Sequence, residues 1–208
     1  YVAFVLTKSA VNMGMPNTEN ASMSALPLGF AYPTNENFPV MLDFCMAYAS
    51  VGQLGEKKRN GKTIDAWWGV NEQGDQTNDP AELLKGTRFP IGLHKGYGMS
   101  MLGEVLTGVM SGGVIMDQKA QEHGLLTNTS QTIIAIKADA IVPMEKFKEQ
   151  TSYISKRAKE LGGEDLNIPG ERSAKSEYKI LEKGYIELTN ELIEKLNSYA
   201  DLFNIKKL

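Results

Sequence analysis

The sequence predicts a mixed α/β (α+β) fold that forms a single unit over residues 1–208, and three observations support this fold class. Apolar runs typical of strands alternate irregularly with stretches in which apolar residues recur at helical spacing. Hydrophobic residues make up 42% of the chain, which is enough to bury a substantial core and argues against disorder. We find no internal repeat, low-complexity tract or linker that would divide the chain.

Three apolar runs in the first part of the chain predict strands, at 2–6, 28–32 and 40–44. The turn-rich segment 33–37 separates the last two runs, so these two strands are expected to form a hairpin. Segment 12–24 is rich in Met, Asn and Ser and lacks periodicity. It is therefore expected to be a long loop, either lying over a site or projecting from the surface.

The remaining elements follow in chain order. The pattern predicts a helix at 47–59 that ends at Asn60 and Gly61, a strand entering a glycine turn at 68–74, and a short helix after Pro80. A helix at 99–110 and a buried strand at 132–136 follow. The chain then continues with a helix from Pro143 that stops at Gly162 and Gly163, and with a last helix that is capped by Thr189 or Asn190 and runs to Phe203.

The helix expected at 99–110 carries one apolar stripe. Its members are Met101, Leu102, Val105, Leu106, Val109 and Met110. Gly103 and Gly108 interrupt this helix at a cost of about 1 kcal/mol each relative to alanine, which indicates close packing against another backbone. We expect the methionines of this stripe to lie in the core and not against a cofactor.

The segment 92–98 places glycines before this helix, together with His94 and Lys95. Unpaired N–H groups at a helix N-terminus attract anions, and a cation at that end is unfavourable by about 0.3–1 kcal/mol. Its presence suggests that an anionic partner such as a phosphate belongs there. The alternative is an ordinary glycine turn with a solvated lysine.

Composition limits the possible partners and compartment. Twenty-two basic and 25 acidic residues give a net charge of −3, without the basic excess of a nucleic-acid-binding protein, so a small metabolite is the better partner. Cys45 is the single cysteine, which excludes an intramolecular disulfide and favours the cytoplasm. No run approaches the ~18 apolar residues of a membrane span. The two histidines form no recognisable metal set with Cys or Asp, so no metal site is predicted.

Several segments, in the same order along the chain, resemble the malate/L-lactate dehydrogenase family of NAD(P)-dependent 2-hydroxyacid oxidoreductases, which is unrelated to the Rossmann lactate dehydrogenases. Segment 94–113 is similar to the family's HKGYG-to-LSG segment, and 41–47 to its VLDMATS strand end. Segments 30–33, 79–80 and 168–171 are similar to its FAIP strand, TDP turn and IPGE loop. The resemblance covers nearly the whole chain.

This resemblance implies a non-Rossmann NAD(P)-binding sheet packed with helices, in line with the absence of a GxGxxG motif. It implies hydride transfer between NAD or NADP and a small 2-hydroxy or 2-oxo acid. It also divides the chain into a cofactor-binding region, 1–140, and a C-terminal helical region, 141–208, that would pack with a missing N-terminal part. The family's catalytic histidine and substrate-binding arginine would lie in that part, upstream of Tyr1, so no catalytic residue is expected in this chain.

The family's cofactor contacts can be carried over by position. They fall on Ser9, on Met41, Leu42, Asp43, Phe44 and Cys45, on His94 and Lys95, and on Gly170, Glu171 and Arg172. Ser9 could instead cap a turn, and Cys45 could be a small buried hydrophobic residue. Asp43, if buried, would need a partner such as a cofactor hydroxyl, a backbone N–H or Lys95.

Other positions depart from the family pattern. Lys8 replaces an asparagine and either binds an acidic group or is solvated, and segment 24–27 lacks the usual Gly-Thr-Asn. His123 stands in a polar context typical of an exposed loop. These departures keep open a second interpretation, a noncatalytic relative or fragment that retains the scaffold for ligand binding or assembly.

An association between copies is also expected. The glycine-containing helix, the amphipathic last helix and an unpaired first strand leave much apolar surface to cover, and the family forms dimers with sites near the interface. We therefore expect a homodimer.

Overall fold

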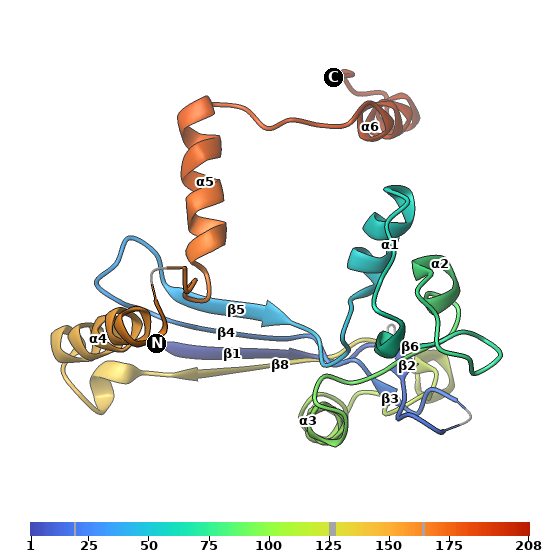
Figure 1. Cartoon of the computed structure of the whole chain (residues 1–208), viewed down its shortest axis with the longest axis horizontal. Coiled ribbons are helices and arrows are strands. Elements are labelled where there is room, and N and C mark those ends of the chain that lie inside the picture. Colours follow the sequence, from blue (N-terminus) through green and yellow to red (C-terminus); the bar gives the residue numbers. More distant parts are fainter. Residues whose placement is uncertain (19, 125–127, 164) are drawn as a thin grey trace.

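The computed structural model describes residues 1–18, 20–124, 128–163 and 165–208 (Figure 1). The strands are β1 (Val2–Thr7), β2 (Val11–Met13), β3 (Met23–Ser24), β4 (Leu28–Tyr32), β5 (Val40–Phe44), β6 (Gly69–Val70), β7 (Thr87–Arg88) and β8 (Gln131–Ile136). The α-helices are α1 (Val51–Arg59), α2 (Pro80–Leu83), α3 (His94–Glu104), α4 (Met144–Gly162), α5 (Glu171–Lys183) and α6 (Asn190–Phe203). Short helical turns are η1 (Ala66–Trp68), η2 (Val105–Val109), η3 (Ala120–His123) and η4 (Ala138–Ala140).

The main sheet has the strand order β5-β4-β1-β8, and all its pairs are antiparallel. β4 and β5 form the expected hairpin, with Leu28 opposite Phe44. β1 lies in the middle of the sheet between β4 and β8, so the expectation of an unpaired first strand is wrong. β8 forms an edge and is not the buried strand that its apolar run predicted, since the Ile133 side chain is 68% exposed.

A second sheet, with the order β3-β2-β7-β6, contains part of the segment expected to be a loop. β2 and β3 pair within segment 12–24, and Met13 and Met23 belong to the hydrophobic core. Strands of two or three residues are too short to show an alternating pattern, so they could not be predicted from periodicity. Arg88 of β7 is almost wholly buried, and its Nη1 donates to the Ala49 carbonyl at 2.9 Å.

The helix expected at 99–110 begins earlier, at His94, and passes into the π-helical turn η2. Its buried face consists of small and polar residues, including Ser100, Gly103 and Thr107. A Cβ on Gly103 would collide with the Leu26 side chain, so close packing explains that glycine, although its neighbour is a side chain and not the expected backbone. Leu106 is half-buried against the core.

The rest of the apolar stripe faces outward. Its exposed members are Met101, Leu102, Val105, Val109 and Met110, with Met110 72% exposed. Our placement of these methionines in the core is therefore wrong for this chain. The apolar periodicity correctly predicted a helix, but periodicity alone does not say whether the apolar face of that helix is covered by the same chain.

Several boundaries also differ from expectation. α1 begins after its cap Ser50, because Ala47 forms a bridge with Pro90 instead of a helical turn. The strand expected at 68–74 shrinks to β6, preceded by η1. α4 and α6 have the expected bounds, and the Thr189 hydroxyl accepts the Leu192 N–H at 3.3 Å. α4 buries the polar residues Thr151 and Ser155, whereas its apolar residues Ile154 and Leu161 are exposed.

α5 was not predicted from the sequence. It rises from the edge of the main sheet beside β5, and α6 lies beyond its far end (Figure 1). Apolar side chains of α5 and α6 remain exposed, including Leu181, Leu202 and Phe203. Within the described residues no helix has the length and apolar content needed to cross a membrane.

Candidate functional site

The two faces of the main sheet carry side chains of different size. One face presents aromatic residues, with Phe4 opposite Phe30 in the register of β1 and β4. The other face presents Ala3, Gly29 and Ala31 over the same strands. Because side chains alternate between faces along a strand, these small residues leave space above one side of the sheet.

The first hollow lies over this small-residue face and has a volume of about 740 Å³. Its floor comes from β1, β4 and β5, and its roof comes from residues 167–170, which precede α5. Its lining includes Ala3, Gly29, Ala31, Met41, Leu42, Asp43, Asn167, Ile168, Pro169, Gly170, Arg172 and Ser173.

The roof is fixed to the edge of the sheet by backbone geometry. The Met41 N–H donates to the Pro169 carbonyl at 3.2 Å. Gly170 has φ +94°, and a Cβ there would lie 2.9 Å from the Pro39 carbonyl oxygen, so glycine is required at this close approach. Gly170 also caps α5 and leaves the first turn of that helix facing the hollow.

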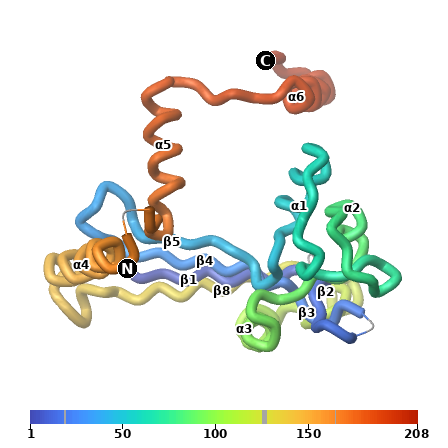
Figure 2. The backbone as a smooth tube through the Cα atoms, in the orientation of Figure 1, coloured from blue at the N-terminus to red at the C-terminus, as the bar shows by residue number. Residues whose placement is uncertain are grey.

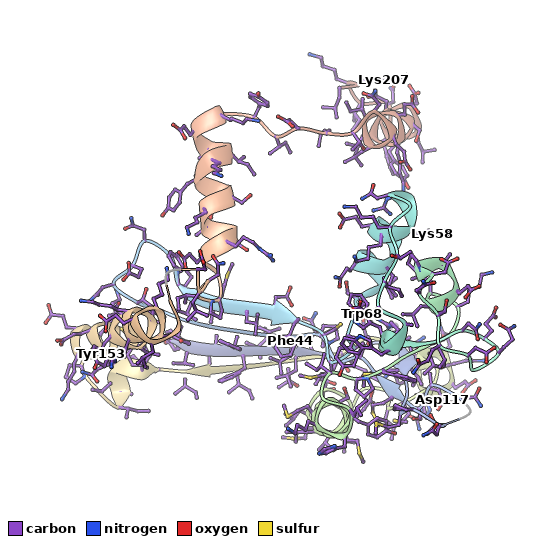
Figure 3. All side chains as sticks on the ribbon, viewed as in Figure 1. Phe44, Lys58, Trp68, Asp117, Tyr153 and Lys207 are labelled. Atoms are coloured by element: carbon purple, nitrogen blue, oxygen red, sulfur yellow. The ribbon has the colours of Figure 1, made fainter. Side chains whose placement is uncertain are left out.

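A second hollow of about 520 Å³ surrounds the end of β5, where Figure 3 labels Phe44. Asp43 lines both the first and the second hollow, so the two adjoin. Most of the remaining lining residues come from the start of α1 and its approach, and they include Cys45, Tyr48, Ser50 and Gln53, while Pro27 and Ile91 come from elsewhere in the chain. The Ser50 hydroxyl is engaged in capping α1, where it accepts the Gln53 N–H at 3.1 Å.

The third hollow, of about 820 Å³, lies on the aromatic face between the sheet and α3. Its lining is almost entirely apolar and includes Phe4, Leu28, Phe30, Met46, Met99, Ile134 and Ile136. Lys95 is its one charged lining residue. Phe44 and Ile91 line both the second and the third hollow. The three hollows therefore follow one another around the end of β5, and we call this arrangement the β5 track.

Most of the carried-over residues lie on the β5 track. Met41, Leu42, Gly170 and Arg172 line the first hollow, Asp43 lines the first and second, Cys45 lines the second, Phe44 the second and third, and Lys95 the third. Segments more than 120 residues apart in sequence thus meet at one strand end. Asn167, Ser173 and Tyr48 also line the track but were not expected there, because no motif in the sequence marks these three positions.

Three of the carried-over residues do not line the track. His94 is exposed on the first turn of α3. The Glu171 side chain is turned toward lysines and a backbone N–H. The Ser9 hydroxyl is buried and has no hydrogen-bond partner among the described residues, so it does not cap a turn and remains available to a bound group.

Charged groups near the site fall into two classes. Lys95 and Arg172 are exposed and form no ion pair with any described residue. Glu171 is fully engaged, and hydrogen bonds from Lys159, Lys175 and the Ile168 N–H lower its pKa to about 2. Burial lowers the pKa of the Arg88 guanidinium, an effect partly offset by the nearby Cys45.

One local expectation needs correction. Lys8 is neither solvated nor paired with an acid among the described residues: it is 2% exposed, and its ammonium donates to the Met116 carbonyl at 3.0 Å. Asp43 is exposed, so the condition under which it would need a buried partner does not arise. Cys45 is half-buried, with its thiol directed to the Ala47 carbonyl at 3.4 Å. His123 is exposed as expected, although it ends the short helix η3.

The residues of the β5 track fit an extended polyanion with flat ring ends. A cation without an ion pair among the described residues lines each of the first and third hollows, Arg172 and Lys95 respectively, and the small-residue floor leaves room in the first hollow. A nicotinamide dinucleotide has this chemistry. Among the described residues no group of three or more His, Cys, Asp or Glu side chains could hold a metal ion.

Known proteins provide an independent comparison. The sequence model of a family described as malate/L-lactate dehydrogenase matches residues 1–197. The malate/(S)-sulfolactate dehydrogenase of Methanothermus fervidus is 30% identical over 224 positions, which cover 99% of this chain and 63% of that protein. The delta(1)-pyrroline-2-carboxylate reductase of Ancylobacter novellus is 36% identical over 99 positions, 47% of this chain and 29% of that protein.

Solved structures agree on the fold. The malate dehydrogenase of Entamoeba histolytica superposes with a TM-score of 0.87 at 21% identity and covers 99% of this chain and 62% of that one. The sulfolactate dehydrogenase of Methanocaldococcus jannaschii gives a TM-score of 0.79 at 22% identity, with 99% and 60% covered. These similarities confirm the mixed α/β class. The chain spans roughly three fifths of the length of these full-length relatives.

Proposed function

Because the chain belongs to the malate/L-lactate dehydrogenase family, we propose that it is the cofactor-binding part of an NAD(P)-dependent oxidoreductase that interconverts a small 2-hydroxy acid and the corresponding 2-oxo acid. Its relatives include dehydrogenases of malate and sulfolactate and reductases of cyclic imino acids. We further propose a cytoplasmic location, which rests on the single unpaired cysteine.

The observation that carries this proposal is the β5 track. The end of β5 brings together three segments that the family resemblance marked separately, at 41–45, at Lys95 and at 170–172. A dinucleotide has two phosphates between two nucleosides, so it needs cations and shaped space along an extended path. The β5 track offers both.

The residues have distinct proposed roles. Arg172 and Lys95 bind phosphate groups as charge-assisted donors, and Asp43 accepts a hydrogen bond from a ribose hydroxyl. The bound cofactor supplies or accepts the hydride. The apolar walls of the third hollow provide a surface on which a ring can pack, while its open side remains in contact with water. Asp43 favours a free ribose and Arg172 favours an added phosphate, so NAD and NADP both remain candidates.

The proton donor is proposed to come from outside this chain. Reduction of a 2-oxo acid needs an acid for the forming alkoxide and a cation for the substrate carboxylate. Neither histidine lines the three hollows, since His94 and His123 are both exposed elsewhere. This observation also favours the second candidate function, a noncatalytic relative or fragment that keeps the ligand-binding scaffold.

Titration calorimetry of the folded chain with NADH and with NADPH tests the main proposal. We expect saturable binding of at least one cofactor, with a preference between the two. ADP-ribose, which lacks the nicotinamide, separates the contribution of the adenosine-diphosphate part. Absence of binding by NADH, NADPH and ADP-ribose would contradict the proposed function.

We also propose that the chain forms a homodimer through the exposed stripe of α3 and η2. Five large apolar side chains form this stripe, and a single chain leaves them in water. Light scattering should give the mass of two chains, and Val105→Glu should shift the protein to monomers because it places a charge in the middle of the stripe. A mass that stays monomeric at all concentrations would contradict this proposal.

A further inference from the structure

Residues 167–170 form the roof of the first hollow, and Glu171 connects this roof with α4 and α5. Glu171 Oε1 lies 2.8 Å from the Nζ of Lys159, in the last turn of α4. The same oxygen lies 2.8 Å from the Nζ of Lys175, one turn further along α5. Oε2 accepts the N–H of Ile168, which is part of the roof itself, at 3.1 Å. One carboxylate therefore holds α4, α5 and the roof together.

Both helices are anchored separately on the turn between β4 and β5, whose strands form the floor of the hollow (Figure 2). From α4, the Thr151 hydroxyl donates to the Pro33 carbonyl at 2.9 Å, and the Ser152 hydroxyl accepts the Asn35 N–H at 2.8 Å. From α5, the Tyr178 hydroxyl donates to the Asn37 carbonyl at 3.0 Å. Among the described residues, the backbone hydrogen bond between roof and floor is the one from the Met41 N–H to the Pro169 carbonyl, beside the close approach of Gly170 to Pro39.

Glu171 is buried, with 7% of the residue exposed, yet it does not line the hollow. Its four lone-pair directions are largely used by two ammonium groups and a backbone N–H, so little capacity remains for a ligand. This arrangement does not suit the direct cofactor contact expected from the family resemblance.

We propose that Glu171 is a positioning residue for the cofactor: its ion pair with Lys159 holds the roof at a fixed height above the β4–β5 floor, and cofactor affinity depends on that height. This inference rests on the proposed function. The ion pair with Lys159 is the important contact, because Lys159 belongs to α4, which precedes the roof in sequence, and Glu171 directly follows the roof. Lys175 lies on the same helix as Glu171 and cannot set the roof's position.

Four variants separate this role from a merely structural one. Glu171→Gln keeps an acceptor for the Ile168 N–H but removes the charge. Lys159→Met removes the connection between helices, and Lys175→Met removes an equally short contact within α5. Glu160→Gln is the charge-matched control, because Glu160 pairs with Arg157 on the exposed side of α4 at 2.8 Å.

The measurements are the dissociation constant for the preferred cofactor, the exchange rate of the Met41 amide hydrogen and the thermal midpoint. If the roof stays closed in about a third to a tenth of the molecules, the dissociation constant rises about threefold to tenfold. We expect this rise, with faster Met41 exchange, for Glu171→Gln and Lys159→Met. Lys175→Met and Glu160→Gln should change neither quantity, whatever their effect on the thermal midpoint.

Two results would overturn the inference. Unchanged Met41 exchange in both Glu171→Gln and Lys159→Met would show that the roof does not depend on this ion pair. Faster exchange without a change in affinity would show that the cofactor does not sense the roof. If the unmodified chain binds no cofactor, the proposed function fails, and the exchange measurement still decides whether Glu171 holds the roof.

Discussion

The first and third hollows of the β5 track differ in how much of their enclosure the chain itself supplies. The first has a floor of small residues and a roof held by a backbone hydrogen bond and by the ion pairs of Glu171. The third has apolar walls, a single cation and no roof, and its neighbour α3 turns an apolar stripe to solvent. Polar contacts thus complete the first hollow, whereas the third needs an apolar surface from elsewhere.

Because of this difference, we expect cofactor binding and hydride transfer to depend on different hollows. A complete first hollow can hold the phosphate-bearing half of a dinucleotide without help. An open third hollow leaves a ring bound there in contact with water, where a hydride transfer is poorly protected. We therefore expect the chain to keep affinity for the cofactor and to lack turnover.

The largest expected effect concerns turnover by the chain alone. Loss of the proton donor lowers the rate on the order of 10²–10⁴-fold, and loss of the cation that orients the substrate lowers it further. NADH oxidation with pyruvate, oxaloacetate and bulkier 2-oxo acids measures this directly. Rapid turnover by residues 1–208 would mean that the chain contains catalytic residues which the account has missed.

The two cations provide the next largest effect. Each charge-assisted phosphate contact contributes about 1.5–3 kcal/mol, so Lys95→Ala and Arg172→Ala should each weaken cofactor binding about tenfold or more. Lys85→Ala and Arg59→Ala are matched controls, since both side chains are exposed and line none of the three hollows. Arg172→Ala should weaken ADP-ribose binding as well. If Lys85→Ala and Arg59→Ala weaken cofactor binding as much as Lys95→Ala and Arg172→Ala do, the loss reflects the overall surface charge and not specific phosphate contacts.

The smallest expected effect is a pH dependence of stability that belongs to the first hollow. The pKa of Glu171 falls from an ordinary value near 4.5 to about 2 in the folded chain. A lowered pKa stabilises the folded state above the unfolded-state value, and this contribution is lost as the pH falls from about 4.5 toward 2. The difference in unfolding free energy between the native chain and Glu171→Gln should therefore shrink over that interval. A difference that stays constant would mean that the Glu171 charge does not stabilise the fold.

The sequence predicted the main elements because their signals are local. The hairpin of β4 and β5 follows from two apolar runs and a turn, and α6 follows from a cap and a clear period. α5 was missed because its segment is dominated by charged residues and begins after a glycine, without a side-chain cap. The boundary of α1 was misplaced because the Ala47 to Pro90 bridge is a long-range contact.

The site was predictable only through the family resemblance, and only in part. Periodicity says nothing of how residues 41–45, Lys95 and 170–172 meet around a strand end, because that meeting is set by tertiary packing. The role of Lys8 was misjudged for the same reason: its partner is the carbonyl of Met116, far away in sequence. The outward direction of the α3 stripe depends on which surfaces other chains or segments cover.

Amide hydrogen exchange of the chain with and without a saturating cofactor tests the central claim most directly, because it shows which segments the ligand touches. We expect slower exchange in three separate peptides at once, covering 39–47, 92–97 and 167–174, and no slowing in α6 at 190–203. Slower exchange confined to one of the three, or found only outside them, would contradict a binding site that runs around the end of β5.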